Sequence, residues 1–290
     1  MRLKVYADRM SEPSRAVVIF CKINGIDFEE IKVDLAKRQQ YSPEFKELNP
    51  MSKVPAIVDG KFNLFESHAI LIYLACAFPG VADHWYVIAH QFIPDYVPCY
   101  MKLLKICVIS WMQDNMILTS FHISRYPNDL FKRAKIHSVL DWHHSNLRYG
   151  AVKFVQNVAL GPALGLPLNP EAAALGEKIL SAALDKIESF WLKGNGKFLL
   201  GSNQPSIADL SLFCEIMQLE VVDEKDRTRI LGPHKKVQQW IENTKNATRP
   251  HFDEVHKILF KVKERLQQQQ SVAASSDNTS STKTTLHSKM

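Results

Sequence analysis

Ser11 is the first residue whose type and place suggest chemistry. It stands in YADRMSEPSRAVVIFCKINGI, where an apolar strand-like opening ends and a helix is expected to begin. A serine before a helix commonly caps it, although Glu12 and Pro13 themselves suit the first helical turn. Beside the positive end of the helix dipole, the same hydroxyl can instead stabilise an anion. No GxSxG motif surrounds Ser11, so a serine hydrolase has little support.

Glu66 and Ser67 form a second candidate site, at the junction of an expected strand and an expected helix. The exposed N–H groups and the dipole at a helix N-terminus favour an anion there. Two interpretations stay open from these residues alone. Either the pair binds an anionic ligand, or Ser67 only caps the helix and Glu66 is a solvated strand end.

Other reactive side chains do not form a convincing site. His137, Asp141 and His144 fall at i, i+4 and i+7 on one helical face, but no fourth ligand is visible, so we expect no metal. Cys21 lies in the apolar run VVIFCKI and is expected in the core. The five cysteines are odd in number and follow no CxxC spacing, which favours free thiols in a reducing compartment.

The bulk composition excludes several classes of protein. With 290 residues the chain is long enough for one large domain or two ordinary ones. No run of eighteen or more uncharged apolar residues occurs, so no membrane association is expected, and the N-terminus is not a cleavable signal peptide. A net charge of +6 is modest for this length, so nucleic-acid binding is not expected.

The elements around the candidate residues predict an α/β domain over residues 1–82. Strands are expected at 2–7, 28–35, 54–59 and 62–67, and helices at 12–25, 42–50 and 68–78. Asp59-Gly60 is a strong hairpin signal, and Ser67 is expected to cap the helix that follows it. The order βαβαββα predicts a small mixed sheet with helices on its faces.

The remainder of the chain predicts a second, all-α domain over residues 127–270. Helical patterns run through 127–148, 169–194, 206–221, 234–246 and 251–267. Ser206 and Asp209 have capping-box spacing, which we assign to stability. Residues 271–290 are rich in Ser, Thr and Asn, and we expect a disordered tail there.

Six segments together resemble the cytosolic glutathione transferases, and more narrowly the theta class of plants. They are VYADRMSEPSRAV, LNPMSKVPAIVDG, LFESHAILIYL, LDWHHSNLR, FLLGSNQPSIADLS and HKKVQQWIENTK. No single segment is decisive, but their order and spacing over nearly the whole chain are specific. The resemblance implies a thioredoxin-like N-terminal domain, a helical-bundle C-terminal domain and a homodimer. It also implies glutathione as co-substrate, with no other cofactor.

The resemblance assigns glutathione, a flexible tripeptide with two carboxylates, to a defined set of residues. Ser67 would hold the γ-glutamyl carboxylate and Glu66 the amino group, while Val54, before an expected cis Pro55, would pair with the cysteinyl backbone. The cation and amides of Lys53, Gln39 and Gln40 suit the glycyl carboxylate. The full expected binding set is Ser11, Glu12, Gln39, Gln40, Lys53, Val54, Glu66 and Ser67.

In this family Ser11 would act neither as nucleophile nor as base. An unperturbed thiol has a pKa near 8.5, and a hydroxyl that donates to the sulfur favours the thiolate. Tyr6 is the rival hydroxyl, since some transferase classes use an early tyrosine, but the RMSEPSR match favours Ser11 as the catalytic residue. Arg15 is expected either to add positive potential or to form a surface salt bridge.

Residues 87–126 do not fit the family pattern, and removing them joins GVADHWY to PNDLFKRAKI. This insertion of about forty residues lies in the interdomain linker at 83–126, where a long loop adds little closure entropy. Two origins stay open: translated intronic sequence, or a tolerated insertion. The insertion threatens the electrophile pocket, the dimer contact and solubility more than the glutathione site.

The chain ends in Ser288, Lys289 and Met290, which resemble the S-K-L address that the peroxisomal import receptor reads. Met in place of Leu is a conservative departure. We therefore expect a peroxisomal location, with the cytosol as the alternative.

Three kinds of function stay open from the sequence. The first is a transferase that conjugates the glutathione thiolate to small hydrophobic electrophiles and also reduces organic hydroperoxides. The second is a protein that binds glutathione and apolar ligands without catalysis, the activity having been lost through the insertion. The third is a structural or adaptor module, against which the intact set Ser11, Val54, Glu66 and Ser67 argues.

Overall fold

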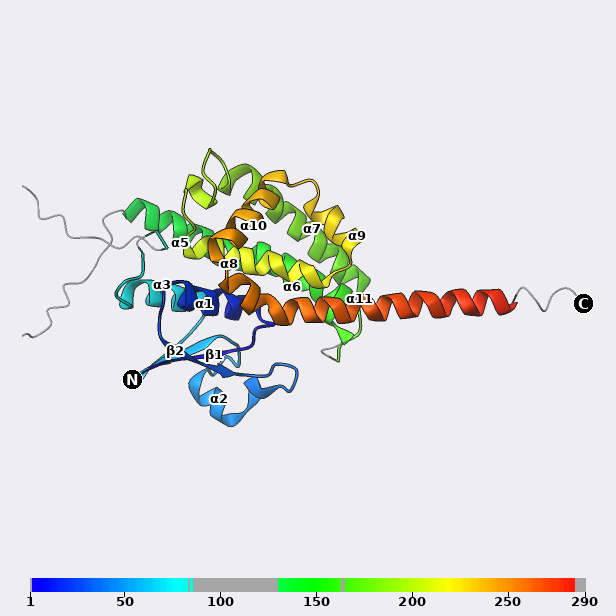
Figure 1. Cartoon of the computed structure of the whole chain (residues 1–290), viewed down its shortest axis with the longest axis horizontal. Helices are drawn as coiled ribbons and strands as arrows, with labels where there is room; N and C mark the ends of the chain where they lie inside the picture. The colour runs from blue at the N-terminus through cyan, green and yellow to red at the C-terminus, as the bar shows by residue number, and fades with distance from the viewer. Residues whose placement is uncertain (1, 83, 86–129, 163–164, 285–290) are drawn as a thin grey trace, which may run out of the picture.

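The computed structural model describes residues 2–82, 84–85, 130–162 and 165–284, and side chains up to residue 269 (Figure 1). An α/β domain at the N-terminus is followed by a domain built from helices. The insertion at 87–126 and the terminal Ser288, Lys289 and Met290 lie outside the described residues.

The N-terminal domain is a four-stranded sheet with helices on both faces. Its strands are β1 (Leu3–Ala7), β2 (Phe28–Lys32), β3 (Ala56–Asp59) and β4 (Phe62–Phe65), and its helices are α1 (Glu12–Ile23), α2 (Pro43–Leu48) and α3 (Ser67–Ala77). The strand order is β2-β1-β3-β4, with β1 parallel to β2 and antiparallel to β3. This mixed, thioredoxin-like sheet confirms the predicted fold class.

The C-terminal domain is all helical. Its helices are α5 (Leu130–Ser145), α6 (Leu147–Val155), α7 (Pro170–Lys186), α8 (Ile207–Ile216), α9 (Glu224–Leu231), α10 (Lys235–Thr248) and α11 (His251–Thr284). Every residue of α8 is buried, and the helix lies at the centre of the domain (Figure 1). No helix in the described part of the chain is long and apolar enough to cross a membrane.

One hydrophobic core runs through both domains. It joins buried side chains of β1, α1 and α3 to those of α5, α6, α7, α8, α10 and α11. Figure 1 shows α1 and α3 between the sheet and the helical domain, with α2 on the opposite face of the sheet. A smaller cluster of Val33, Phe45, Val54 and Ala56 packs under α2. The face of the sheet that carries α1 and α3 is therefore covered by the second domain.

Close packing of α6 on α7 depends on two glycines. A Cβ on Gly150 would lie 2.5 Å from the Leu180 backbone nitrogen, and a Cβ on Gly176 would lie 2.6 Å from that of Phe154. Neither distance is tolerable, so any larger residue would push the helices apart.

Local sequence signals were accurate at most element ends. The β3–β4 hairpin turns at Gly60 with φ +62°, and Gly25 follows α1 with the same φ. The Ser206 hydroxyl and the Asp209 carboxylate form the predicted capping box at the start of α8. Cys21 is buried in the core as expected.

Three expectations need correction. Ser67 is not the cap of α3: the N-cap is Glu66, and Ser67 is the first helical residue. The short helix α9 was missed, because its charged sequence EKDRTRIL has no apolar stripe. Residues 271–284, expected to be disordered, continue α11 as helix, and the preceding run of Gln is favourable to helix.

Candidate active site

The strand register brings the predicted binding residues to one edge of the sheet. Ala56 at the start of β3 pairs with Tyr6 near the end of β1, and also with Phe65 at the end of β4. Ala7 pairs with Lys32 at the end of β2. The segments that follow β1, β2 and β4 therefore begin at this edge. The segment that precedes β3 ends there. These four segments contain every residue of the expected glutathione set.

Ser11 is the N-cap of α1, but its hydroxyl does not act as a cap. The side chain makes no capping hydrogen bond, and the backbone is extended, with φ −76° and ψ 126°. The Ser11 N–H donates to the Asp8 carbonyl at 2.9 Å, which closes a turn between β1 and α1. The residue is 9% exposed. The hydroxyl is thus held at the positive end of α1 and left available to another molecule.

Asp8 ties the Ser11 loop to the loop that follows β2. One carboxylate oxygen accepts from the Met10 N–H at 2.9 Å, and the other accepts from the Leu35 N–H at 3.0 Å. Sequence reasoning missed Asp8, since an aspartate after a strand is common in turns. It braces the segments that carry Ser11 and Gln39.

Arg15 is fully buried, which overturns the expected surface salt bridge. One end of its guanidinium donates to the carbonyls of Arg9 and Met10, at 3.1 and 3.0 Å. The other end donates to the Cys214 carbonyl at 3.0 Å and to the Gln218 side chain at 2.7 Å. Arg15 therefore joins the loop before Ser11 to α8 and the turn after it.

Tyr6, the rival hydroxyl, is a packing residue. Its ring lies 6.3 Å from that of Phe45 and packs against the small cluster under α2. This placement favours Ser11 over Tyr6 as the residue that faces a thiol.

Glu66 and Ser67 occupy the start of α3 in a strained conformation. Glu66 has φ +71° and ψ 111°, which is rare for a residue with a side chain, and its side chain makes no capping bond. Such strain commonly marks a ligand site. The first N–H groups of α3, at Ser67 and beyond, have no partner within the helix and suit a carboxylate.

The segment before β3 presents backbone to the same edge. The Val54–Pro55 peptide bond is cis, as predicted. Asn49, which is 1% exposed, donates to the Lys53 carbonyl at 2.7 Å and accepts from the Met51 N–H at 3.0 Å. Asn49 was missed by sequence reasoning, although Asn before Pro in LNPMSKVP is itself a turn signal. Its side chain fixes the loop that leads to Val54.

The amides after β2 differ from one another. Gln39 uses its side-chain oxygen locally, to accept from the Asp34 N–H at 2.8 Å. The side-chain oxygen of Gln40 is buried and has no hydrogen-bond partner among the described residues. Lys53 is exposed. A carboxylate at this position would have to be bound by the amide N–H groups of Gln40 or the ammonium of Lys53, because the buried oxygen of Gln40 can only accept a hydrogen bond.

Glu12 turns inward, toward a buried group of charges. Its carboxylate lies 3.9 Å from the guanidinium of Arg148, which donates at 2.7 Å to Glu215. Burial, and then the charge of Glu215, raise the pKa of Glu12, while Arg148 opposes the increase. Arg148, the charged partner of Glu12, belongs to the C-terminal domain, and it also interacts electrostatically with Glu66.

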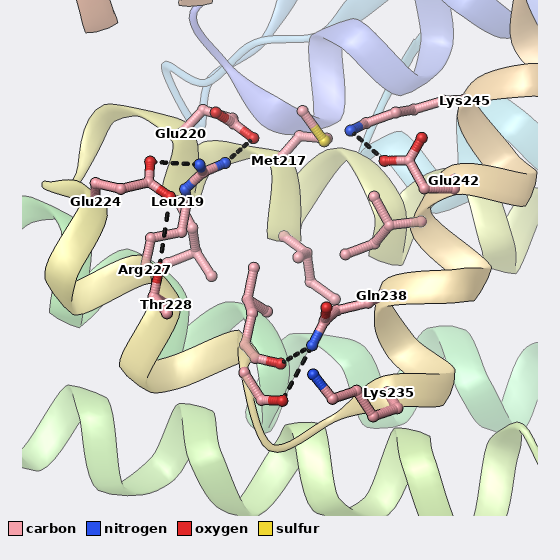
Figure 2. Close-up of a pocket in the computed structure, with 14 residues that line it drawn as sticks. Met217, Leu219, Glu220, Glu224, Arg227, Thr228, Lys235, Gln238, Glu242 and Lys245 are labelled. Carbon is pink, nitrogen blue, oxygen red and sulfur yellow. Dashed lines mark hydrogen bonds and ion pairs between the residues drawn. The ribbon is translucent and has the colours of Figure 1, made fainter.

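A cavity of about 360 Å³, drawn in Figure 2, lies in the C-terminal domain between the end of α8 and helices α9 and α10. Arg227 pairs there with Glu220 and Glu224, and Lys245 pairs with Glu242 (Figure 2). No residue of the N-terminal domain lines it, so it is separate from the edge described above. Within the described ranges, no group of three or more His, Cys, Asp or Glu could hold a metal.

Comparison with known proteins agrees with this geometry. Residues 1–76 match the family Glutathione S-transferase, N-terminal domain, and residues 170–243 match Glutathione S-transferase, C-terminal domain. Glutathione S-transferase T1 of Arabidopsis thaliana is 63% identical over 92% of this chain and 93% of its own length. Glutathione S-transferase T3 of the same plant is 58% identical over 95% of this chain, which spans only 40% of that longer protein.

Solved structures give the same result. Human glutathione transferase theta-2, in complex with glutathione and an unknown ligand, has a TM-score of 0.71 at 29% identity, over 92% of this chain and 91% of that one. A human theta-class enzyme with the glutathione conjugate of 1-menaphthyl sulfate has the same TM-score and identity, over 93% and 92%. The fold, the arrangement of the site and these relatives agree: the chain belongs to the glutathione S-transferase family, in the theta class as plants have it.

Proposed function

We propose that this protein conjugates the thiolate of glutathione to small hydrophobic electrophiles, with Ser11 stabilising the thiolate. The observation that carries the proposal is the Ser11 hydroxyl, which has no capping bond although it stands at the N-terminus of α1. Val54, just before β3, and Ser67, just after β4, stand next to strand ends at the same edge of the sheet. Glutathione serves as co-substrate, and no other cofactor is required.

The proposed chemistry follows from the charge on sulfur. A free thiol ionises with a pKa near 8.5, so only a small fraction is thiolate at neutral pH. The Ser11 hydroxyl donates to the sulfur, and the positive end of α1 adds a favourable potential. The thiolate then attacks the electrophile. Serine stays chemically unchanged, and the proton of the thiol leaves to solvent.

The remaining contacts hold the ends of glutathione. Ser67 and the first N–H groups of α3 receive the γ-glutamyl carboxylate, and Glu66 pairs with the amino group. The Val54 backbone pairs with the cysteinyl residue. Gln40 and Lys53 receive the glycyl carboxylate, with Gln39 beside them. Glu12 belongs to the proposed glutathione-binding set as the residue next to Ser11 in the sequence.

The experiment compares Ser11→Ala with Ser14→Ala by two readouts: thiolate absorbance of bound glutathione across pH, and turnover with an aryl halide. Ser14 is a matched control, since its buried hydroxyl has no hydrogen-bond partner among the described residues. We expect Ser11→Ala to raise the pKa of the bound thiol and to lower turnover at neutral pH at least tenfold, about 1.4 kcal/mol. Ser14→Ala should behave as wild type. Equal turnover in all three proteins removes Ser11 from its role.

A second proposed activity is the reduction of organic hydroperoxides. The thiolate attacks the terminal oxygen of the hydroperoxide and the alcohol leaves. A second glutathione then reduces the sulfenic acid to glutathione disulfide and water. The C-terminal Ser288, Lys289 and Met290 support this activity, because import into peroxisomes would place the protein near such substrates. A fluorescent protein that carries these last residues and stays cytosolic would contradict the peroxisomal location.

We further propose that the protein works as a homodimer. Sedimentation of the full chain tests this directly.

A protein that binds glutathione as thiolate but turns over neither a halide nor a hydroperoxide would instead be a non-catalytic binding protein for glutathione and apolar ligands.

A further inference from the structure

Two buried histidines from different domains meet beside the start of α3. His68 is the second residue of α3 and lies directly after Ser67, and His143 belongs to α5. Nε2 of His68 lies 3.1 Å from Nδ1 of His143, at hydrogen-bond distance. The two residues are 8% and 3% exposed. No expectation from the sequence included this pair.

Glu215 of α8 faces the other ring nitrogen of His143. Its buried carboxylate lies 3.4 Å from Nε2 of His143. Nε2 of His143 makes no hydrogen bond among the described residues, so this contact with Glu215 is electrostatic. A carboxylate favours the proton on the nitrogen that faces it, which assigns Nδ1 of His143 as the acceptor. Nε2 of His68 must then be the donor of the pair. Burial lowers the pKa of His68 to about 2 and that of His143 well below its ordinary value, so both rings are neutral at physiological pH.

We propose that His68, His143 and Glu215 form a row of contacting side chains that positions the N-terminus of α3 for the γ-glutamyl end of glutathione. His68 and His143 are positioning residues, which act through Glu66 and Ser67 and need not touch glutathione. The inference rests on the proposed glutathione site and adds to it a support from the C-terminal domain.

The need for such a support follows from the strain at Glu66. A φ of +71° in a non-glycine residue is unfavourable and persists only where neighbouring contacts impose it. His68 is two residues away and is the first side chain of α3 to be buried against the other domain. Its hydrogen bond to α5 fixes the direction of the first turn, and therefore of the N–H groups at Ser67.

Three further side chains surround His68, His143 and Glu215. The ring of His144, also from α5, lies 4.3 Å from that of His68, and α6 supplies Arg148, which donates to Glu215 at 2.7 Å. Glu12 of α1 faces the same guanidinium nitrogen of Arg148, at 3.9 Å. One carboxylate oxygen of Glu215, Oε2, thus faces both the Arg148 guanidinium at 2.7 Å and the His143 imidazole at 3.4 Å.

The predicted effect is specific for glutathione binding. The γ-glutamyl end is remote from the reacting sulfur, so loss of its positioning weakens ground state and transition state alike. Such a change raises the KM for glutathione and leaves kcat nearly unchanged. A general loss of folded protein would instead lower the apparent kcat.

The experiment uses the full chain and three variants: His68→Leu, His68→Gln and His256→Leu. Leucine removes the donor, whereas glutamine places an amide N–H near the position of Nε2. His256 is the matched control, since it is a fully buried histidine of α11 whose Nδ1 lies 3.1 Å from the Phe252 carbonyl. Measured are the KM for glutathione, kcat with saturating aryl halide, and the melting temperature.

We expect His68→Leu to raise the KM for glutathione about five- to tenfold, with kcat within about twofold of wild type. His68→Gln should restore most of the affinity. His256→Leu should lower the melting temperature without a change in KM. The inference fails if His68→Leu leaves KM unchanged, or if His256→Leu raises KM as much for the same loss of melting temperature. A wild-type protein that does not bind glutathione would refute the proposed function instead.

Discussion

The buried guanidinium of Arg15 donates a 2.7 Å hydrogen bond to the side-chain oxygen of Gln218. Arg15 stands four residues after Ser11, and Gln218 lies in the turn that follows α8. The other end of the guanidinium holds the carbonyls of Arg9 and Met10. Arg15 therefore connects the loop that carries Ser11, the proposed thiolate-stabilising residue, to the C-terminal domain, and Arg9 of the same loop adds a contact to Glu254 of α11 at 3.4 Å.

The first prediction concerns this hydrogen bond. Gln218→Leu should lower the free energy of unfolding by about 2 kcal/mol, because one buried N–H of the charged guanidinium loses its acceptor while the other still donates to the Cys214 carbonyl. Gln218→Glu should lose less, since it supplies a carboxylate to the same guanidinium. Urea unfolding monitored by tryptophan fluorescence measures both. An equal loss in the two variants would show that the contact is one of packing.

The second prediction concerns Asn49. Asn49→Ala should raise the KM for glutathione about fivefold, because the loop before Val54 loses both hydrogen bonds that fix it. Asn24→Ala is the control: its side chain also donates to a backbone carbonyl, that of Phe20, but at the C-terminal end of α1. Steady-state kinetics with varied glutathione measures the difference. Similar KM values for the two variants would contradict a role for Asn49 at the site.

The third prediction is a pH dependence of stability. Folded His68 stays neutral, whereas the unfolded chain takes up a proton below the ordinary histidine pKa of about 6.5. The unfolded state therefore gains protons first, and the free energy of unfolding falls as pH decreases through this range. His68→Gln removes this proton and should reduce the slope by up to about 1.4 kcal/mol per pH unit between about pH 5 and 6.

The test compares the free energy of unfolding of wild type with that of His68→Gln across pH. Glu12 and Glu215 are buried, and burial raises the pKa of each carboxyl. Their contribution has the opposite sign, since the folded state keeps protons on these groups as pH rises above about 4.5. Both proteins share that contribution, so it cancels. Parallel curves of unfolding free energy against pH would contradict the neutral state of His68.

The fourth prediction concerns residues 87–126. All residues assigned to glutathione lie before residue 83, so a chain in which residue 86 is joined to residue 127 should keep the wild-type KM for glutathione. Its solubility and its kcat/KM for the electrophile should rise, because the deleted residues are rich in apolar side chains and lie, in the sequence, between the two domains. Kinetics and sedimentation of both forms measure this. Indistinguishable turnover, association and solubility would show that the insertion is neutral.

The sequence was sufficient for most of the N-terminal domain. Gly25, Asp59-Gly60 and the alternating apolar strands are local signals, so the element order and the hairpin could be predicted without tertiary information. The same is true of the Ser206 capping box, whose two partners are three residues apart.

Contacts between distant residues could not be predicted. The pair His68 and His143 is separated by 75 residues, and Arg15 and Gln218 by 203. Nothing near Arg15 in the sequence distinguishes a buried guanidinium from an exposed one. The cap of α3 was misassigned for a related reason. Ser is the usual cap by preference, but here Glu66 is the N-cap, in a backbone conformation with φ +71° that its residue type does not predict.

The central position of α8 has a consequence for how the chain can be divided. Every residue proposed to touch glutathione lies in the first 82, which invites the idea of a stand-alone binding module. Yet Arg15 and His68 both find their partners beyond residue 142. A fragment cut at the linker would keep every residue proposed to contact glutathione. It would lose the hydrogen bonds from the C-terminal domain that hold those residues in position. The interdomain boundary separates two folds, but it does not separate two working parts.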